Sequence, residues 1–148
     1  MLIVILLASC NSSVQTGEAS PASKSIVGTW KLLSGTLIEK GDTTVTDYTR
    51  DREFIKIING THFAFLGHDL SKGKNADSSF SSGGGHYTLN DSAYTEHLEY
   101  CNDRQWEGNA FPFTVTIQND TLIQKGIEKI DSLGVNRLNI ERYVRLKD

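Results

Sequence analysis

The sequence has few cysteines, no long hydrophobic run and no marked excess of charge, and each of these absences excludes a class of protein. Two cysteines in 148 residues are too few for a disulfide scaffold. Fifteen Lys and Arg against 18 Asp and Glu give a net charge of −3, which excludes a strongly basic nucleic-acid-binding surface and an acidic disordered tail. The length fits a single domain with its own hydrophobic core.

A short apolar run, residues 2–8, opens the chain. It cannot span a bilayer, which takes about 20 residues as a helix, but it matches the hydrophobic region of a secretory signal. No Lys or Arg precedes the run, although such signals usually open with a positive region, and a start site assigned too far downstream would explain this. Residues 11–23 are small, polar and nearly uncharged, which predicts a flexible tether.

The end of this run, Leu7-Ala8-Ser9-Cys10, resembles the lipobox of bacterial lipoproteins. The resemblance implies removal of residues 1–9, a diacylglyceryl lipid on Cys10 and a membrane as partner of the mature N-terminus. Asn11 stands where an inner-membrane retention signal would place Asp, so the resemblance implies the cell envelope, at the outer membrane. A signal peptide that is cut elsewhere and a chance apolar start are the alternatives.

Short strand-like runs separated by turn residues make up the rest of the chain. Asn59-Gly60 lies between two apolar runs and predicts a hairpin, because a type I′ turn needs positive φ at both central residues. Asn90-Asp91 and Asn119-Asp120 also lie between strand-like runs and predict two further hairpins. Strands are expected over residues 26–38, 43–46, 53–58, 61–66, 87–89, 93–101, 111–118, 121–130 and 138–146.

The connections between these runs complete the expected architecture. Residues 69–82 and 102–110 read as loops, and residues 131–134 as a turn. Trp106, in the second loop, either covers the mouth of a barrel or rests outside it. No window has a convincing helical period. About eight strands joined as a meander of hairpins favour an all-β, antiparallel up-and-down β-barrel, since closure removes exposed edges.

Gly28-Thr29-Trp30, which enters the first strand, resembles the Gly-x-Trp signature of lipocalins. The resemblance covers about residues 26–146 and implies an eight-stranded barrel with Trp30 at one end and an arginine of the last strand packed across it. We assign Arg142 to this signature, with Arg145 as the open alternative. The segments 83–88 and 94–100 resemble those of small lipocalin-like envelope lipoproteins without an assigned activity. The expected division is therefore signal 1–9, lipidated tether 10–25 and barrel domain 26–148.

Strand alternation identifies a candidate ligand contact in the run 93–101. Tyr94, Glu96, Leu98 and Tyr100 share one face, which we assign to the interior because it is the more aromatic. A two-residue turn at Asn90-Asp91 places Tyr87 opposite Tyr94 on this face. A carboxylate inside a barrel is costly unless it is paired or hydrated, which makes Glu96 the leading candidate.

Other interpretations of this strand remain open. In the first, Glu96 has a structural role: it accepts hydrogen bonds from tyrosines or pairs with an arginine of the last strand, and it does not contact a ligand. A slip of one residue would invert the faces and point His97 and Glu99 inward. The phenylalanines either form the core or line a cavity. Arg145 either pairs with an anionic ligand group or stacks on Trp30.

These patterns predict a non-enzymatic, lipid-anchored, lipocalin-like barrel that binds a small molecule. The alternative is a structural or interaction lipoprotein whose barrel is filled by side chains, and an enzyme using Glu96 as general base is the weakest reading. The four histidines lack metal-ligand spacing and no phosphate-binding loop is present, so no metal, cofactor or nucleic acid is expected. The ligand-binding candidates are Tyr87, Tyr94, Glu96, Tyr100, Tyr143 and Arg145.

Overall fold

The computed structural model describes residues 25–76 and 78–147. The expected signal sequence, Cys10 and the tether up to residue 24 lie outside the described residues. The described part forms ten strands and two short 3-10 helices. These are β1 (Gly28–Glu39), β2 (Asp42–Asp47), β3 (Arg52–Ile58), β4 (His62–Asp69), β5 (Phe80–Asn90), β6 (Ala93–Leu98), β7 (Tyr100–Cys101), η1 (Arg104–Trp106), β8 (Asn109–Gln118), β9 (Thr121–Ile130), η2 (Asp131–Leu133) and β10 (Val135–Arg145).

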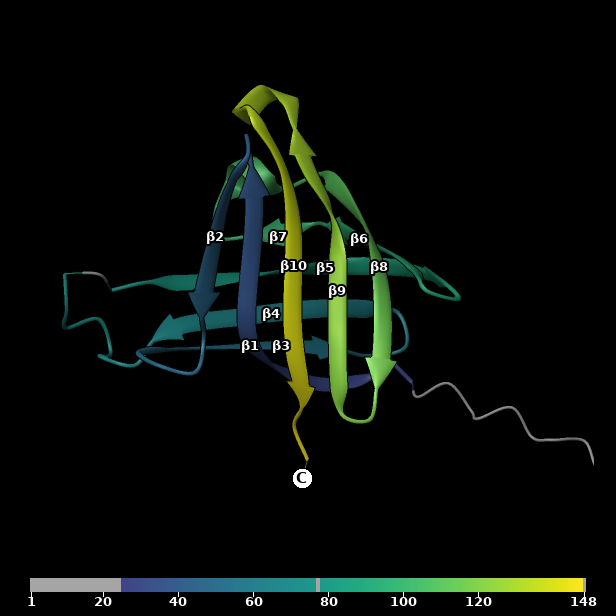
Figure 1. The fold of residues 1–148 in the computed structure, drawn as a ribbon, viewed down its shortest axis with the longest axis horizontal. Coiled ribbons are helices and arrows are strands. Elements are labelled where there is room, and N and C mark those ends of the chain that lie inside the picture. The colour runs from purple at the N-terminus through teal and green to yellow at the C-terminus, as the bar shows by residue number, and fades with distance from the viewer. Residues whose placement is uncertain (1–24, 77, 148) are drawn as a thin grey trace, which may run out of the picture.

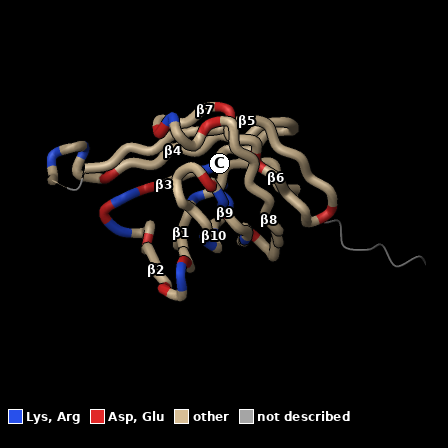
Figure 2. The backbone as a smooth tube through the Cα atoms, turned by 90° about the horizontal axis from the view of Figure 1, so that it is seen from above, with Lys and Arg blue, Asp and Glu red and all other residues tan. Residues whose placement is uncertain are grey.

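Eight of these strands close into an antiparallel up-and-down barrel, which confirms the expected fold class. Around the barrel the strands follow the order β1-β3-β4-β5-β6-β8-β9-β10, and β10 closes the barrel by pairing with β1 (Figure 1). Strand β2 pairs with β1 and strand β7 with β5, outside this ring. Strand β1 changes partners along its length: Gly28–Lys31 pairs with β3, and Ser34–Glu39 pairs with β2. A register shift between Leu32 and Ser34 marks the change. Seen from above, β4 and β5 lie on one side of the molecule and β1, β10 and β8 on the other (Figure 2).

The first two hairpin turns differ from their predicted form. Asn59 pairs with His62, and the Asn59 side-chain oxygen accepts the backbone N–H groups of Thr61 and His62 at 2.9 and 2.8 Å. Neither Asn59 nor Gly60 has positive φ, so the type I′ prediction is wrong there. The side chain of asparagine organises the turn in its place.

At the second hairpin Asn90 pairs with Ala93, one residue further than predicted, with Asp91 at a φ of 52°. Tyr87 therefore faces Glu96 across the strands, and Leu89 faces Tyr94, so the predicted pairing of Tyr87 with Tyr94 is wrong. The turn moves by one residue, and this shifts each residue's partner on β6 by two positions. Because side chains alternate with a period of two, the predicted inward and outward faces are kept. The third hairpin is as predicted, with Gln118 paired to Thr121.

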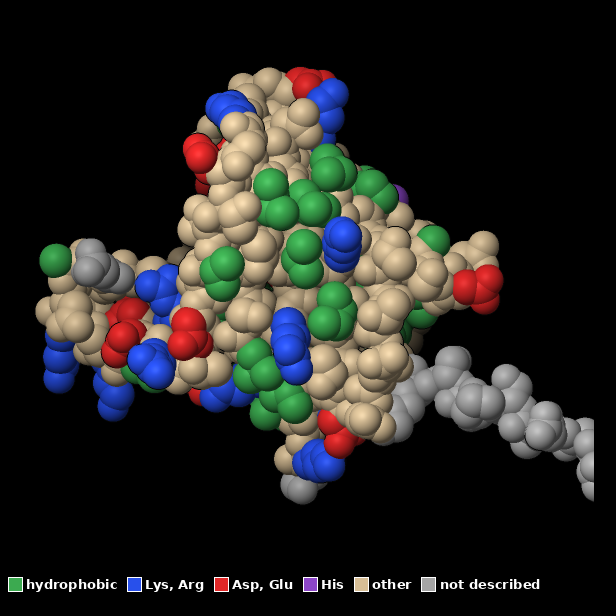
Figure 3. Space-filling view, viewed as in Figure 1, with side chains coloured by type: hydrophobic (Ala, Val, Ile, Leu, Met, Phe, Trp, Pro, Cys, Tyr) green, Lys and Arg blue, Asp and Glu red, His purple; other side chains and the backbone are tan. Residues whose placement is uncertain are grey.

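The lower end of the barrel is closed by a packed core. The segment before β1 crosses beneath the strands (purple in Figure 1). The largest fully buried side chains in the described residues are Trp30, Leu32, Ile58, Tyr94, Leu122, Gln124 and Tyr143. On the outer face of β9 and β10, aliphatic side chains lie beside Lys125 and Arg142 because side chains alternate along each strand. Figure 3 shows apolar and basic side chains over these strands.

Candidate functional site

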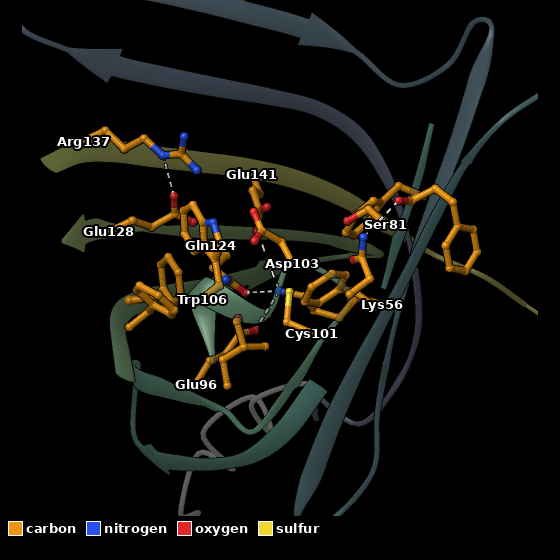
Figure 4. A pocket seen from close by; sticks show the side chains of 17 residues that line it. Lys56, Ser81, Glu96, Cys101, Asp103, Trp106, Gln124, Glu128, Arg137 and Glu141 are labelled. Carbon is orange, nitrogen blue, oxygen red and sulfur yellow. Dashed lines mark hydrogen bonds and ion pairs between the residues drawn. The ribbon is translucent and has the colours of Figure 1, made fainter. Parts of the chain in front are cut away.

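A pocket of about 370 Å³ occupies the barrel interior above this core (Figure 4). Its lining combines polar and apolar side chains in similar measure, and the apolar part includes Phe54, Phe65, Leu98, Phe111 and Phe113. Phe54 and Phe65 stack with ring centroids 5.6 Å apart. The phenylalanines are thus divided between core packing and the wall of a cavity, which answers the question that the sequence left open.

Two glycines make room for the stacked rings. A Cβ atom on Gly67 would lie 2.5 Å from the ring of Phe54, and one on Gly83 would lie 2.5 Å from the ring of Phe65. Both glycines pair across the sheet with the phenylalanine that uses their space. The shape of the pocket wall therefore depends on glycine at these two positions.

The floor of the pocket is a buried polar cluster from four strands. Lys56 of β3 is 3% exposed and donates to the Glu96 carboxylate at 2.7 Å and to Gln124 Oε1 at 3.1 Å. The Glu141 carboxylate of β10 lies 3.7 Å from the same ammonium group. Lysine has no acceptor, so the contact with Lys56 fixes the orientation of the Gln124 amide. Gln124 Nε2 is buried and has no partner in the described residues.

Burial and mutual charge set the protonation of this cluster. Burial raises the pKa of the Glu96 carboxyl, and the nearby Lys56 ammonium opposes that rise only in part. Burial lowers the pKa of Lys56, but the carboxylates of Glu96 and Glu141 outweigh it and hold the pKa above its usual value. Lys56 therefore stays protonated at neutral pH, as the counter-ion of two carboxylates.

Two buried tyrosines adjoin the cluster. The Tyr143 hydroxyl donates to Glu141 at 2.8 Å, and burial raises its pKa well above the usual range. The Tyr94 hydroxyl is buried without a hydrogen-bond partner in the described part of the chain, and burial and the Glu96 charge raise its pKa. Both tyrosines are therefore neutral, and the Tyr143 hydroxyl acts as a donor to the cluster.

The mouth of the pocket carries a second ion pair next to Trp106. Arg137 donates to Glu128 at 2.7 Å, and its guanidinium lies 5.1 Å from the centre of the Trp106 ring. Asn139 donates to the other Glu128 oxygen at 2.8 Å. Trp106 packs 5.8 Å from Phe111 and lines the pocket, so it covers the mouth, one of the two positions that the sequence allowed.

The structure brings three of the six ligand-binding candidates together. Tyr94, Glu96 and Tyr143 are buried around the polar cluster. Glu96 pairs with a lysine of β3, whereas the sequence suggested tyrosines or an arginine of the last strand. Tyr87 is half-buried near Tyr94, with ring centroids 5.2 Å apart, and its hydroxyl donates to the Asn59 carbonyl away from the floor.

The inward orientation predicted for Tyr100 is wrong. Strand β6 ends at Leu98, and Tyr100 belongs to the separate strand β7, where it is 70% exposed. The interruption at Glu99 breaks the alternation on which the prediction relied. Tyr100 therefore lies on the outer surface of the barrel.

Arg145 forms the contact across the tryptophan that the sequence analysis assigned to Arg142. The Arg145 guanidinium lies 4.0 Å from the centre of the Trp30 ring and donates to the carbonyls of Val27 and Ser25. Arg142 is exposed on the outer face of β10. Gly28 has a φ of 147°, and a Cβ atom there would lie 2.4 Å from Arg145 Nη1. Arg145 thus belongs to the closed end of the barrel and does not line the pocket.

Sequence reasoning missed five of the polar residues at the site. The alternation of side chains predicts that Gln124 and Glu128 share one face of β9, but the sequence of a single strand does not show which face is interior. The same holds for Arg137 and Glu141 on β10. Lys56 had the weakest signal, since a lysine between apolar residues is usually assigned to the solvent face.

The fold and the pocket together define a closed eight-stranded β-barrel that could bind a ligand, an arrangement compatible with a calycin-like fold. No protein-family model matches the chain, and no curated protein matches it significantly. In the described residues, no helix is long and apolar enough to cross a membrane. Within the same residues, no group of three or more His, Cys, Asp or Glu side chains is placed to hold a metal ion.

Proposed function

We propose that the protein is a non-enzymatic, lipocalin-like lipoprotein that binds a small molecule inside its barrel and is held at an envelope membrane by a lipid on Cys10. The observation that carries the binding function is the pocket of about 370 Å³, which has aromatic walls and an ordered polar floor. Ligand sites are commonly concave, apolar and equipped with a few placed polar groups, at volumes of about 300–1,000 Å³.

The polar floor supports binding over a purely structural role. A buried donor without a partner costs about 1–3 kcal/mol, and Gln124 Nε2 has no partner among the described residues. A barrel that served only as a scaffold would be better stabilised by apolar side chains at these positions. The alternative of an interaction lipoprotein with a filled barrel fits this pocket less well.

Blocking the mouth of the pocket tests the binding function. Ser81 lines the pocket, whereas Ser82 is the next residue of β5 and faces the outer side. Ser81→Trp is therefore expected to reduce binding of the neutral fluorescent probe N-phenyl-1-naphthylamine at least roughly tenfold, because the indole occupies the entrance. Ser82→Trp is the matched control and should bind as the unmodified protein does. Equal binding by both variants, or no binding by the unmodified protein, would contradict the proposal.

The membrane anchor is tested on the protein isolated from cell envelopes. Mass spectrometry is expected to find a chain that begins at Cys10 with the added mass of a diacylglyceryl group, and Cys10→Ala should leave the membrane fraction. Measured under native conditions, the same sample should carry a retained small molecule that Ser81→Trp lacks. A mature chain that begins elsewhere without lipid would overturn the anchor and leave the binding function to be judged by the probe.

A further inference from the structure

The charges around the pocket are unequal. Four carboxylates line it, from Glu96, Asp103, Glu128 and Glu141, against the two cations Lys56 and Arg137. Even if the Glu96–Lys56 ion pair is left out of the count, three carboxylates remain against the cation Arg137. Inside a barrel bulk water is partly excluded and charges are screened less than at the surface, so such an imbalance acts on an entering ligand.

Both cations already have partners. Lys56 donates to Glu96 and Gln124, at 2.7 and 3.1 Å, and its remaining side faces Glu141. Arg137 donates to Glu128 at 2.7 Å and covers Trp106. An anionic ligand would have to compete with these contacts and would add to the excess of negative charge.

The Glu141 carboxylate has acceptor capacity left and is more accessible than that of Glu96, whose side chain is only 9% exposed. Asp103 also lines the pocket, but it is exposed to solvent, which screens its charge. One oxygen of Glu141 accepts the Tyr143 hydroxyl and is the oxygen that lies 3.7 Å from Lys56. The other oxygen accepts no hydrogen bond from the described residues. The side chain is 17% exposed and lines the pocket, so a ligand can reach it.

The pocket walls suit a cation as well. Phe54, Phe65, Phe111 and Trp106 line the pocket together with the polar floor. The faces of aromatic rings attract cations, and this attraction is largest where water is excluded. Aromatic walls above a carboxylate match a molecule that has a protonated amine at one end and an apolar ring at the other.

We infer that the ligand is a small organic cation, an amine attached to an apolar ring system, whose ammonium group binds the Glu141 carboxylate while its ring lies between the aromatic walls. This inference rests on the proposed binding function and gives it a ligand class. Glu141 contributes the charge, and the phenylalanines and Trp106 contribute the apolar contact.

Three probes of nearly equal size test the ligand class on the purified full-length chain. They are 2-(1-naphthyl)ethylamine, the neutral 2-(1-naphthyl)ethanol and the anionic 1-naphthylacetate, each titrated by calorimetry at neutral pH and low salt. We expect the amine to bind at least roughly tenfold more tightly than the alcohol, and the carboxylate to bind most weakly. This comparison needs no variant, so it does not depend on the folding of one.

Two variants then locate the charge. Glu141→Gln keeps an acceptor for the Tyr143 hydroxyl and is expected to bring the amine to within about twofold of the alcohol. Asp91→Asn removes a carboxylate at a hairpin tip outside the pocket, in a backbone conformation that asparagine tolerates, and should keep the preference for the amine.

Each outcome decides between the two proposals. Equal binding of amine and alcohol would overturn the ligand class while the binding function stands, and a preference that survives Glu141→Gln would overturn Glu141 as the group that binds the ammonium. Binding of none of the three probes, together with no retained molecule in the native mass spectrum, would count against both.

Discussion

Replacing Lys56 with methionine is expected to destabilise the protein by about 3–5 kcal/mol at neutral pH. The substitution keeps the volume and apolar stem of the side chain but leaves Glu96 buried without its counter-ion at 2.7 Å. Urea unfolding followed by circular dichroism measures the change in free energy. Adding Glu96→Gln to the same chain should recover a large part of the loss, because the buried charge is then removed.

An ion pair at the surface provides the matched control. Lys31 and Glu53 also lie 2.7 Å apart, but both side chains are partly exposed, at 33% and 42%. Lys31→Met is expected to cost less than about 1 kcal/mol, since exposed pairs contribute little. A similar cost for Lys31→Met and Lys56→Met would show that burial of the Lys56 pair has no special effect.

The cost of Lys56→Met should also depend on pH. Burial already raises the pKa of Glu96 in the folded protein, and removal of the Lys56 ammonium raises it further. A carboxyl whose folded pKa lies above its unfolded value contributes most stability below the unfolded value, and that contribution is lost as pH rises through the folded pKa. The difference between variant and unmodified protein is therefore expected to be smallest at acidic pH and to grow toward neutrality. A difference that is constant with pH would contradict this account.

Replacing Trp30 with alanine is expected to cost about 3–5 kcal/mol, the usual range for a large buried aromatic side chain. Trp30 is fully buried, donates to the Ile26 carbonyl at 2.8 Å and supports the Arg145 guanidinium on its ring. Trp30→Phe should cost less, since a ring remains under Arg145 although the hydrogen bond is lost. Unfolding is best followed by circular dichroism, since the substitution changes the tryptophan fluorescence.

The second tryptophan separates stability from binding. Trp106 lies at the mouth of the pocket and is only partly buried. Trp106→Ala is therefore expected to cost clearly less stability than Trp30→Ala. It should weaken the binding of the naphthyl probes, because part of the pocket wall is removed. If Trp106→Ala destabilised the protein as much as Trp30→Ala, the assignment of the two ends as core and entrance would be wrong.

The fold could be predicted from local patterns because hairpin turns and alternation are local signals. Asn119-Asp120 gave the correct register, and Gly28 and Trp30 correctly marked the closed end. The type of turn at Asn59-Gly60 was wrong because a side-chain hydrogen bond, and not the glycine, organises it. The error at Tyr100 arose because alternation fails where a strand is interrupted.

The site was less predictable because it depends on which distant strands close the barrel. Glu96 was identified from one strand, but its partner Lys56 is 40 positions earlier and Gln124 is 68 positions after Lys56. Arg145 was named as a ligand candidate, with stacking on Trp30 as the open alternative, and the structure shows the stacking. The chain alone does not show at which end of β10 the pocket opens. A sequence pattern shows which residues of one strand share a face. The site also depends on which strands are neighbours in the closed barrel, and the pattern of a single strand does not show this.

The closure of β1 against β10 also governs when the chain can fold. Arg145 donates to the Val27 carbonyl across 118 residues of sequence, and β10 is the last strand to be synthesised. Loop-closure entropy makes such distant pairings slow to form, and the earlier strands have an open edge until β10 arrives. Folding of the barrel is therefore completed only after the whole domain is available, and its rate should be limited by the final docking of β10 on β1.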